Sequence, residues 1–467
     1  MAKYVFVVGG VLSGVGKGIT AASIGAILQA KGLKVSIMKC DPYLNVDAGM
    51  LCPAEHGECF VTHDGKETDL DLGHYERFLD VETDRFSTVL SGGMFNELLT
   101  AEREGKFGGK TVQLVPHFTN LIQDKIEQSQ ASQDSDVHII EIGGTVGDME
   151  SLSYIEAARE FASRVGRKNC LYVSVVWVPW INTSKELKTK PAQNALHELR
   201  GFGIMPDLVC ARTELPAPHG ILSKIAAFAG LDEDAVINLP DVASVYEVPL
   251  NLARTGAIDI LDQFAGGGRA DLESWRALSH RLTEDYYRTV RVGIIAKYDN
   301  HDVYLSALEA LKAAAQACQT NLQIVWLDAN TTDDSDWRGV DGLFAQGETR
   351  VAEFALEADH PFLGVGTCLA SVVKTGNNII QLTENSKVAS IYSESEIIER
   401  ARNSRCSLAN VMSDSRFVVS GKSGKDAMFV EAPNKKFIVL TATNPEFRSR
   451  PMRPHPLYVE FIRSLIK

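Results

Sequence analysis

One stretch at the start of the chain restricts the possible folds more than any other. The run Lys3–Gly10 is continuously apolar and ends in two glycines, and the loop Val11–Gly18 follows it. Ile19–Lys31 then has helical composition, and Lys34–Lys39 has the composition of a second buried strand. A strand, a glycine-rich loop with a lysine, a helix and a strand in this order are typical of a phosphate-binding loop. The sequence therefore predicts a phosphate site near the N-terminus.

This loop differs from the usual pattern at two places. Gly10 lies one residue too early, and Gly18 follows Lys17 where Ser or Thr would bind a metal ion, although Thr20 is close behind. The N–H groups of the loop and the positive end of the helix would still attract a phosphate, and Lys17 would add a full charge. A glycine-rich turn without a ligand is the alternative interpretation.

The overall composition limits the class of protein. With 467 residues, the chain is long enough for two or three domains with large cores. No apolar run is long enough to span a membrane, and we expect no signal peptide and no membrane partner. The eight scattered cysteines indicate reduced thiols and a cytoplasmic location. A net charge of −13 argues against general nucleic-acid binding but not against nucleotide binding.

The strand candidates predict the fold class. Near-continuous apolar strands that alternate with helical stretches, such as Ser153–Val165 and Ala192–Gly201, predict a parallel sheet covered on both faces. The polar helical segment Asp271–Thr289 indicates a linker before a new set of strands. We predict an α/β protein with a P-loop parallel-sheet domain at 1–266, a linker at 267–289 and a second α/β domain at 290–467. The predicted strands after the first two are His138–Ile142, Cys170–Trp177, Asp207–Ala211, Ala235–Leu239, Val290–Lys297, Leu322–Leu327, Val340–Ala345, Pro361–Val365 and Lys436–Thr441.

Two acidic residues are candidates for a metal site. Glu141 lies at the carboxyl end of a predicted buried strand, where open α/β sheets have their ligand crevice. A carboxylate there suits Mg²⁺ on an ATP phosphate. Asp71 lies in the acidic stretch Glu67–Asp71, and taken alone it is equally well explained as a solvated loop charge.

Two lysines form a basic motif around Thr189. Alternation would place the ammonium groups of Lys188 and Lys190 on one face of an extended segment, and Pro191 favours that extended state at Lys190. Such a pair, with Gln193 nearby, suits a second polyanion such as a triphosphate. A solvated basic loop is the alternative that the spacing leaves open.

The first 265 residues resemble the synthetase (amidoligase) domain of the CTP synthase family. The matching stretches are SGVGKG, DPYLNVDAG, ETDLDLGHYERF, TVQLVPH, EIGGTVGDMES and KTKPAQ, in this order. The resemblance implies that ATP phosphorylates the 4-oxygen of UTP, after which ammonia attacks C4 and phosphate leaves. Lysines, loop amides and Mg²⁺ would supply the positioning and charge neutralisation that phosphoryl transfer needs.

The resemblance also implies roles for individual residues. Lys17 and Lys39 would be catalytic residues at the phosphates, and Asp71 and Glu141 would bind Mg²⁺. Pro240 stands where the family has a lysine beside an Asp-Val pair on the adenine side. ATP would contact Ser13, Gly14, Val15, Gly16, Lys17, Gly18, Ile19, Thr20, Asp71, Asp241 and Val242. UTP or CTP would contact Ser13, Asp148, Met149, Glu150, Lys188, Lys190, Gln193 and Lys224.

From about residue 290 the chain weakly resembles a shortened class I glutamine amidotransferase domain. Such a domain needs a Cys nucleophile, a His base with a supporting Glu, and backbone N–H groups for the oxyanion. An ungapped alignment places Gly366 at the nucleophile position and Asn444 and Glu446 at the base and its support. Because Asn cannot act as a general base, we predict that glutaminase activity is absent.

Two further features of this domain bear on the same prediction. The oxyanion segment Gly347–Arg350 carries bulky residues where glycine would give the backbone freedom. Cys368 lies two residues beyond the nucleophile position and is a candidate substitute. A small buried helix residue is the alternative interpretation of this cysteine.

Three hypotheses about function follow. The first is an ATP-dependent amidoligase on UTP or a close relative, which takes ammonia or another amine. The second is a specialised ligase that forms an N4-substituted cytidine nucleotide. The third is a non-catalytic regulator that assembles with a true CTP synthase, although the retained Lys17, Asp71, Glu141, Lys188 and Lys190 count against it. A P-loop ATPase of another activity is more distant. The resemblance further implies a homotetramer and leaves a GTP-like effector open.

Overall fold

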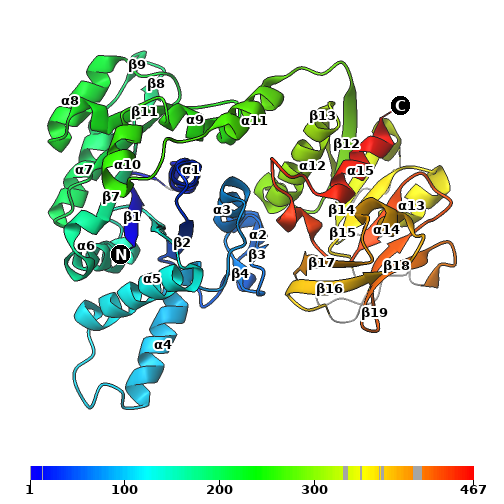
Figure 1. The fold of residues 1–467 in the computed structure, drawn as a ribbon, viewed down its shortest axis with the longest axis horizontal. Coiled ribbons are helices and arrows are strands. Elements are labelled where there is room, and N and C mark those ends of the chain that lie inside the picture. The colour runs from blue at the N-terminus through cyan, green and yellow to red at the C-terminus, as the bar shows by residue number, and fades with distance from the viewer. Residues whose placement is uncertain are drawn as a thin grey trace. The chain divides into compact units, whose positions relative to one another are not determined.

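The computed structural model describes residues 2–12, 14–329, 335–347, 350–367, 369, 373–402 and 413–466. The chain forms two compact units, which Figure 1 shows as a ribbon. The first unit contains residues 1–47, 74–81 and 86–280, and the second contains residues 48–73, 82–85 and 281–467. Two short segments of the N-terminal half therefore belong to the second unit, which the predicted domain ranges did not anticipate.

The first unit is built on a seven-stranded parallel sheet in the order β11-β10-β7-β1-β6-β2-β5. Its strands are buried almost throughout, as their apolar composition requires. Tyr4, Phe6 and Val8 of one strand face share a core with three of the helices that cover this face of the sheet, α4 (Ser91–Arg103), α5 (Thr119–Gln133) and α6 (Leu152–Val165). The strands are β1 (Lys3–Gly9), β2 (Val35–Asp41), β5 (Thr88–Leu90), β6 (Val137–Ile142), β7 (Cys170–Trp177), β10 (Leu208–Thr213) and β11 (Val236–Pro240), and a separate hairpin pairs β8 (Trp180–Ile181) with β9 (Glu186–Leu187).

The helices before β11 lie in the connections between the parallel strands, and three more helices follow β11. The last one, α11 (Glu273–Thr283), lies in the predicted linker, and its final residues belong to the second unit. The others are α1 (Lys17–Ala30), α4 (Ser91–Arg103), α5 (Thr119–Gln133), α6 (Leu152–Val165), α7 (Lys190–Gly201), α8 (His219–Ala229), α9 (Val248–Leu252) and α10 (Ala257–Ala265).

The second unit is built on a nine-stranded mixed sheet in the order β13-β12-β14-β15-β20-β19-β18-β16-β17. The first five strands in this order are parallel, and the remaining ones pair in antiparallel fashion. The strands are β12 (Thr289–Ala296), β13 (Asn321–Asp328), β14 (Gly342–Gln346), β15 (Phe362–Val365), β16 (Gly376–Leu382), β17 (Glu396–Ala401), β18 (Val418–Ser423), β19 (Asp426–Glu431) and β20 (Ile438–Thr441).

Short elements complete the second unit. Its helices are α12 (Leu305–Ala317), α13 (Arg350–Ala358), α14 (Lys387–Tyr392) and α15 (Pro456–Leu465). The segment 48–73 adds α2 (Pro53–His56) and the hairpin of β3 (Phe60–Val61) and β4 (Glu67–Thr68), and α3 (Asp71–Leu79) begins there and ends in the first unit.

The predicted α/β class with two sheet domains is confirmed. Each predicted strand corresponds to an observed one within one or two residues at either end. The sequence reasoning missed β5 and the antiparallel strands from β16 to β19. β16 alternates between buried and more exposed residues and carries Asn and Gln, so it has no continuous apolar run to detect. No helix among the described residues is long and apolar enough to cross a membrane.

Candidate functional site

The glycine-rich loop leads directly into α1. Gly14 and Gly16 have positive φ angles of 75° and 95°, which glycine adopts at little cost. The hydroxyl of Thr20 donates to the carbonyl of Gly16 at 2.8 Å, which fixes the first helical turn. Val11 has φ +87°, and a β-branched residue in that region is strained. The predicted ATP contact Ser13 lies outside the described residues.

Lys17 is buried at the start of α1, and its stem lies against the end of β1. A Cβ atom placed on Gly9 would lie 2.6 Å from Cδ of Lys17, and one placed on Gly10 would lie 2.1 Å from Cβ of Ala195 in α7. The Nζ of Lys17 donates to the carbonyl of Gly144 at 2.7 Å. Gly9 therefore leaves room for the Lys17 side chain, and Gly10 leaves room for α7. This packing gives a reason for glycine at both positions, although Gly10 lies one residue too early for the usual loop pattern.

Three buried charged residues lie where β2 and β6 end. Lys39 and Glu141 are register partners on these neighbouring strands, and Nζ of Lys39 lies 3.5 Å from Oδ1 of Asp41. A Cβ atom on Gly143 would lie 2.8 Å from the same Asp41 oxygen. The hydroxyl of Tyr75 donates to Oε2 of Glu141. The sequence reasoning did not assign Asp41, although its position at a strand end was a usable signal.

These carboxylates fit the requirements of Mg²⁺. Hard divalent cations prefer carboxylate oxygens, and Mg²⁺ is usually held by one or two of them together with substrate phosphates. Glu141 and Asp41 provide such oxygens within the first unit, while Asp71, the first residue of α3, belongs to the second unit. Among the residues that the structure describes, no cluster of three or more His, Cys, Asp or Glu side chains could hold a metal ion.

An arginine that the sequence reasoning missed lies beside the loop. Arg212, near the end of β10, donates through Nη1 to the carbonyl of Leu239 at 2.6 Å and pairs through Nη2 with Asp241 at 2.7 Å. A Cβ atom on Gly16 would lie 3.4 Å from its Nε. The ion pair thus links Asp241, predicted to be on the adenine side, to the phosphate loop. Val242 follows and is partly buried.

The extended conformation predicted around Thr189 is wrong. Thr189 has φ −86° and ψ −9°, and Lys190 is the first residue of α7 with Pro191 directly after it. Proline is favoured in the first helical turn, where its missing N–H costs nothing, and here it starts a helix. Lys188 and Lys190 are both exposed, while Gln193 is buried and donates to the Thr189 hydroxyl at 3.2 Å.

The remaining predicted pyrimidine contacts lie in two places. Lys188 pairs with Glu186, and the pKa of Glu186 is lowered by this hydrogen bond, by one from Ser184 and by the charge of Lys224 on α8. The charge of Lys224 therefore reaches the neighbourhood of Lys188. The other predicted contacts, Asp148, Met149 and Glu150, are exposed in the turn before α6.

The residues that the sequence predicts at the glutaminase positions also come together, within the second unit. Gly366 follows β15 with φ +57°, and a Cβ atom placed on it would lie 3.1 Å from Nδ2 of Asn444. That Nδ2 donates to Oε1 of Glu446 at 2.8 Å, while Oδ1 of Asn444 accepts from the backbone N–H of Arg402 at 3.0 Å. Both ends of the Asn444 amide are therefore engaged, and its side chain lies against the nucleophile position.

Glu446 is buried behind this asparagine. Burial raises its pKa to about 8, although hydrogen bonds from Asn444 and from the hydroxyl of Tyr458, at 3.1 Å, act in the opposite direction. A carboxyl group with this pKa is largely protonated at neutral pH. The candidate nucleophile Cys368 and the oxyanion residues Glu348 and Thr349 lie outside the described residues.

Comparisons with known proteins agree with the N-terminal motifs. The family model described as "CTP synthase N-terminus" matches residues 3–264. CTP synthases of Streptococcus pyogenes and Streptococcus thermophilus are each 36% identical over 532 aligned residues, which cover 100% of this chain and 99% of the relative. The glutaminase domain of Trypanosoma brucei CTPS with bound acivicin matches 38% of this chain and 93% of its own at 21% identity and a TM-score of 0.33. On the family model and the full-length relatives, this chain belongs to the CTP synthase family.

Proposed function

We propose that this chain uses ATP to aminate UTP, or a closely related pyrimidine nucleotide, at C4 without hydrolysing glutamine itself. The observation that carries the proposal is the convergence of Lys17, Lys39, Asp41 and Glu141 at the carboxyl edge of the parallel sheet of a CTP synthase family member. This edge is where open α/β sheets bind their ligands.

The reaction then has two balanced steps. The 4-oxygen of the pyrimidine attacks the γ-phosphorus of ATP, N3 loses its proton and ADP leaves. An amine then attacks C4, loses a proton and expels phosphate. Lys17, now bonded to the Gly144 carbonyl, would turn to the γ-phosphate, and Lys39 would neutralise the transferred group. Glu141 and Asp41 would hold Mg²⁺, which would supply charge neutralisation on the phosphates.

The absence of glutaminase chemistry is part of this proposal. Gly366 has no nucleophilic side chain, and both ends of the Asn444 amide are hydrogen-bonded. Glutamine hydrolysis needs a thiolate, a proton acceptor and an oxyanion site. Nitrogen would therefore arrive as ammonia or as another amine, and the second unit would act as a scaffold.

The test is mass spectrometry of the products formed from ATP, Mg²⁺ and UTP with ammonium, a panel of primary amines, or glutamine. We expect a 4-amino or 4-alkylamino product with ammonium or one of the amines, and no glutamate released from glutamine. Lys17→Ala should abolish the product, whereas Lys34→Ala, which changes an exposed lysine paired with Asp134, should retain it. Product formation by Lys17→Ala, or no product with any amine, would contradict the ligase assignment. Glutamate release that a Cys368→Ala variant loses would contradict the loss of glutaminase activity.

A further inference from the structure

The second unit contains a cavity that neither the nucleotide site nor the altered glutaminase positions use. It has a volume of about 410 Å³ and lies between β17, the end of α14 and the chain that leads into α15. A volume of this size is in the range of pockets for small molecules. The side chains that matter for its chemistry are those of Tyr392, Ile398, Glu399, Arg448, Arg453 and His455.

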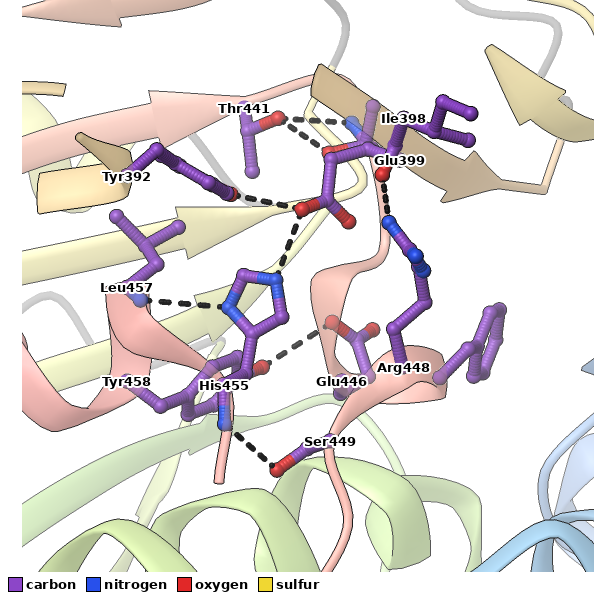
Figure 2. A network of polar contacts seen from close by, with 12 residues as sticks. Tyr392, Ile398, Glu399, Thr441, Glu446, Arg448, Ser449, His455, Leu457 and Tyr458 are labelled. Atoms are coloured by element: carbon purple, nitrogen blue, oxygen red, sulfur yellow. Dashed lines mark hydrogen bonds and ion pairs between the residues drawn. The ribbon is translucent and has the colours of Figure 1, made fainter. Parts of the chain in front are cut away.

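Glu399 is the central group of this cavity. Its side chain is 1% exposed, and its Oε1 accepts hydrogen bonds from the Tyr392 hydroxyl at 2.9 Å and from Nε2 of His455 at 2.8 Å (Figure 2). The other oxygen, Oε2, is buried and has no hydrogen-bond partner among the residues that the structure describes. A buried carboxylate oxygen without a donor is costly, so it marks a place for one.

His455 and Arg448 already donate hydrogen bonds to acceptors other than Oε2 of Glu399. Nδ1 of His455 accepts from the backbone N–H of Leu457 at 3.3 Å, so its Nε2 carries the proton that Glu399 Oε1 receives. Arg448 donates to the carbonyl of Ile398. Burial raises the pKa of Glu399, but His455, Arg448 and the hydrogen bond from Tyr392 together lower it by more, so its net pKa is below the usual value. The carboxylate is therefore ionised, and its second oxygen needs a donor from outside this network.

The walls of the cavity carry both signs of charge. Arg448 and Arg453 line it together with the exposed carboxylates of Glu394 and Glu396 and the buried Glu399. A simple anion would meet three carboxylates, and a simple cation would meet two guanidinium groups. A molecule with an ammonium group next to a carboxylate satisfies both, because guanidinium binds carboxylates well and a carboxylate oxygen accepts from ammonium.

We propose that this cavity binds a free α-amino acid. The ammonium group of the amino acid donates to Oε2 of Glu399, and its carboxylate faces Arg448 and Arg453. The side chain of the amino acid lies along Ile398 and the two prolines that line the cavity, Pro454 and Pro456. Binding in this cavity requires neither a nucleotide nor the ligase reaction. The amino-acid proposal can therefore be tested independently of the proposed function.

The experiment is isothermal titration calorimetry of the full-length chain, without nucleotides, against each of the twenty amino acids. Methylamine, acetate and inorganic phosphate serve as probes of each charge alone. We expect one or a few amino acids to bind with one site per chain, and each single-charge probe to bind at least tenfold more weakly. If phosphate binds as tightly as any amino acid, the cavity is an anion site and this proposal is wrong. If no amino acid binds at about tenfold molar excess over the protein and at concentrations up to the millimolar range, the proposal is also overturned.

Matched variants assign the binding to this cavity. Glu399→Gln should weaken it roughly tenfold to a hundredfold, because a charge-assisted bond becomes a neutral one. Glu384→Gln, an exposed acid outside the cavity, should leave it unchanged. Since Glu399→Gln also alters a buried pair, Ile398→Trp gives a second test that fills the cavity from an exposed position and leaves Glu399 and His455 in place. Unchanged binding in folded Ile398→Trp would show that the amino acid binds elsewhere and would overturn the proposal.

Discussion

At the scale of single residues, the position of Lys17, which we propose binds phosphate, depends on the absence of a side chain at Gly9. Gly9 ends β1 under the Lys17 stem, and no side chain fits there unless the lysine moves. The position of the Lys17 side chain therefore depends on Gly9 as well as on the loop. A pattern that counts only spacing along the chain cannot show this, because the contact joins the end of a strand to the start of a helix.

Gly9→Ala should consequently weaken ATP binding. The added methyl group would lie 2.6 Å from Cδ of Lys17 and would push the ammonium away from the phosphate site. Loss of a charge-assisted contact is worth roughly 1.5–3 kcal/mol, so we expect about tenfold or greater weakening of the ATP dissociation constant. Fluorescence titration with an ATP analogue measures it. Gly201→Ala, at a helical glycine with open space around it, is the control and should bind ATP normally.

Glu446 predicts a pH dependence of stability. Its pKa is raised to about 8 by burial, so the folded state holds a proton that the unfolded state releases above its ordinary pKa. The folded state therefore binds more protons between about pH 4.5 and pH 8, and this contribution to stability is lost as the pH rises through that window.

The comparison of wild type with Glu446→Gln isolates this effect. Between pH 5.5 and pH 7.5 the difference in their unfolding free energies should change by up to about 1.4 kcal/mol per pH unit, in favour of the amide variant at higher pH. Urea unfolding at a series of pH values provides the measurement. Parallel curves for the two proteins would mean that the Glu446 carboxyl is not protonated in the folded state.

At the scale of elements, β17 organises the segment 48–73 of the second unit. Arg400, which is fully buried, donates to the carbonyl of Val61 at 2.9 Å and lies over the ring of Phe60. Arg402 donates to Glu67 at 2.8 Å and to the carbonyl of Gly49 at 3.2 Å. Arg400 of β17 and Arg402, which directly follows this strand, thus hold a hairpin that is more than 330 residues away along the chain.

Arg400→Ala should therefore destabilise the second unit. It leaves the buried carbonyl of Val61 without its donor and removes a large buried side chain, so we expect a loss of at least about 2–3 kcal/mol. Arg416→Ala removes an exposed ion pair with Asp414 and should change the stability little, because water and salt screen such pairs. Thermal or urea unfolding, followed by tryptophan fluorescence, distinguishes the two. Equal effects would contradict a structural role for Arg400 in holding the hairpin.

The start of α7 is the second element that carries a prediction. Lys188 and Lys190 are exposed next to a helix N-terminus, a place that favours anions. We expect Lys188→Ala or Lys190→Ala to weaken pyrimidine nucleotide binding about tenfold to a hundredfold while ATP binding changes little. Lys185→Ala is the control in the same exposed stretch. Competition titrations with UTP and ATP measure both affinities, and an equal loss for ATP would place these lysines at the other nucleotide.

At the scale of the whole molecule, each unit has its own sheet and its own core. The core of the second unit runs from β12 to α15 and is well packed, with Gly366 and Asn444 at positions that we propose have lost their glutaminase groups. Packing and catalysis depend on different residues, so a domain can lose a nucleophile and a base and still fold. The second unit is therefore expected to persist as a stable body without glutamine chemistry.

The family resemblance leads to one prediction about assembly. We expect the chain to form a homotetramer in solution when ATP and UTP are present. Multi-angle light scattering at working concentration should give about four times the 51.0 kDa mass of one chain. A chain that remains a monomer with both nucleotides present would contradict this expectation.

The sequence alone determined the fold class, the order of the parallel strands along the chain and the glycine-rich loop before α1. These features arise from local patterns, since buried parallel strands are continuous apolar runs and the loop is contiguous. Sequence patterns also found Gly366, Asn444 and Glu446, which the fold brings together.

Only the tertiary structure decided the rest. The segment 48–73 joins the second unit through contacts with a distant strand. Lys190 and Pro191 lie in the first turn of α7 instead of an extended segment. Arg212 and Asp41 gain their positions from neighbouring strands, and the cavity around Glu399 is built by residues from β17, α14 and the chain before α15. Such features depend on contacts between residues far apart in sequence, whose energies no local pattern contains.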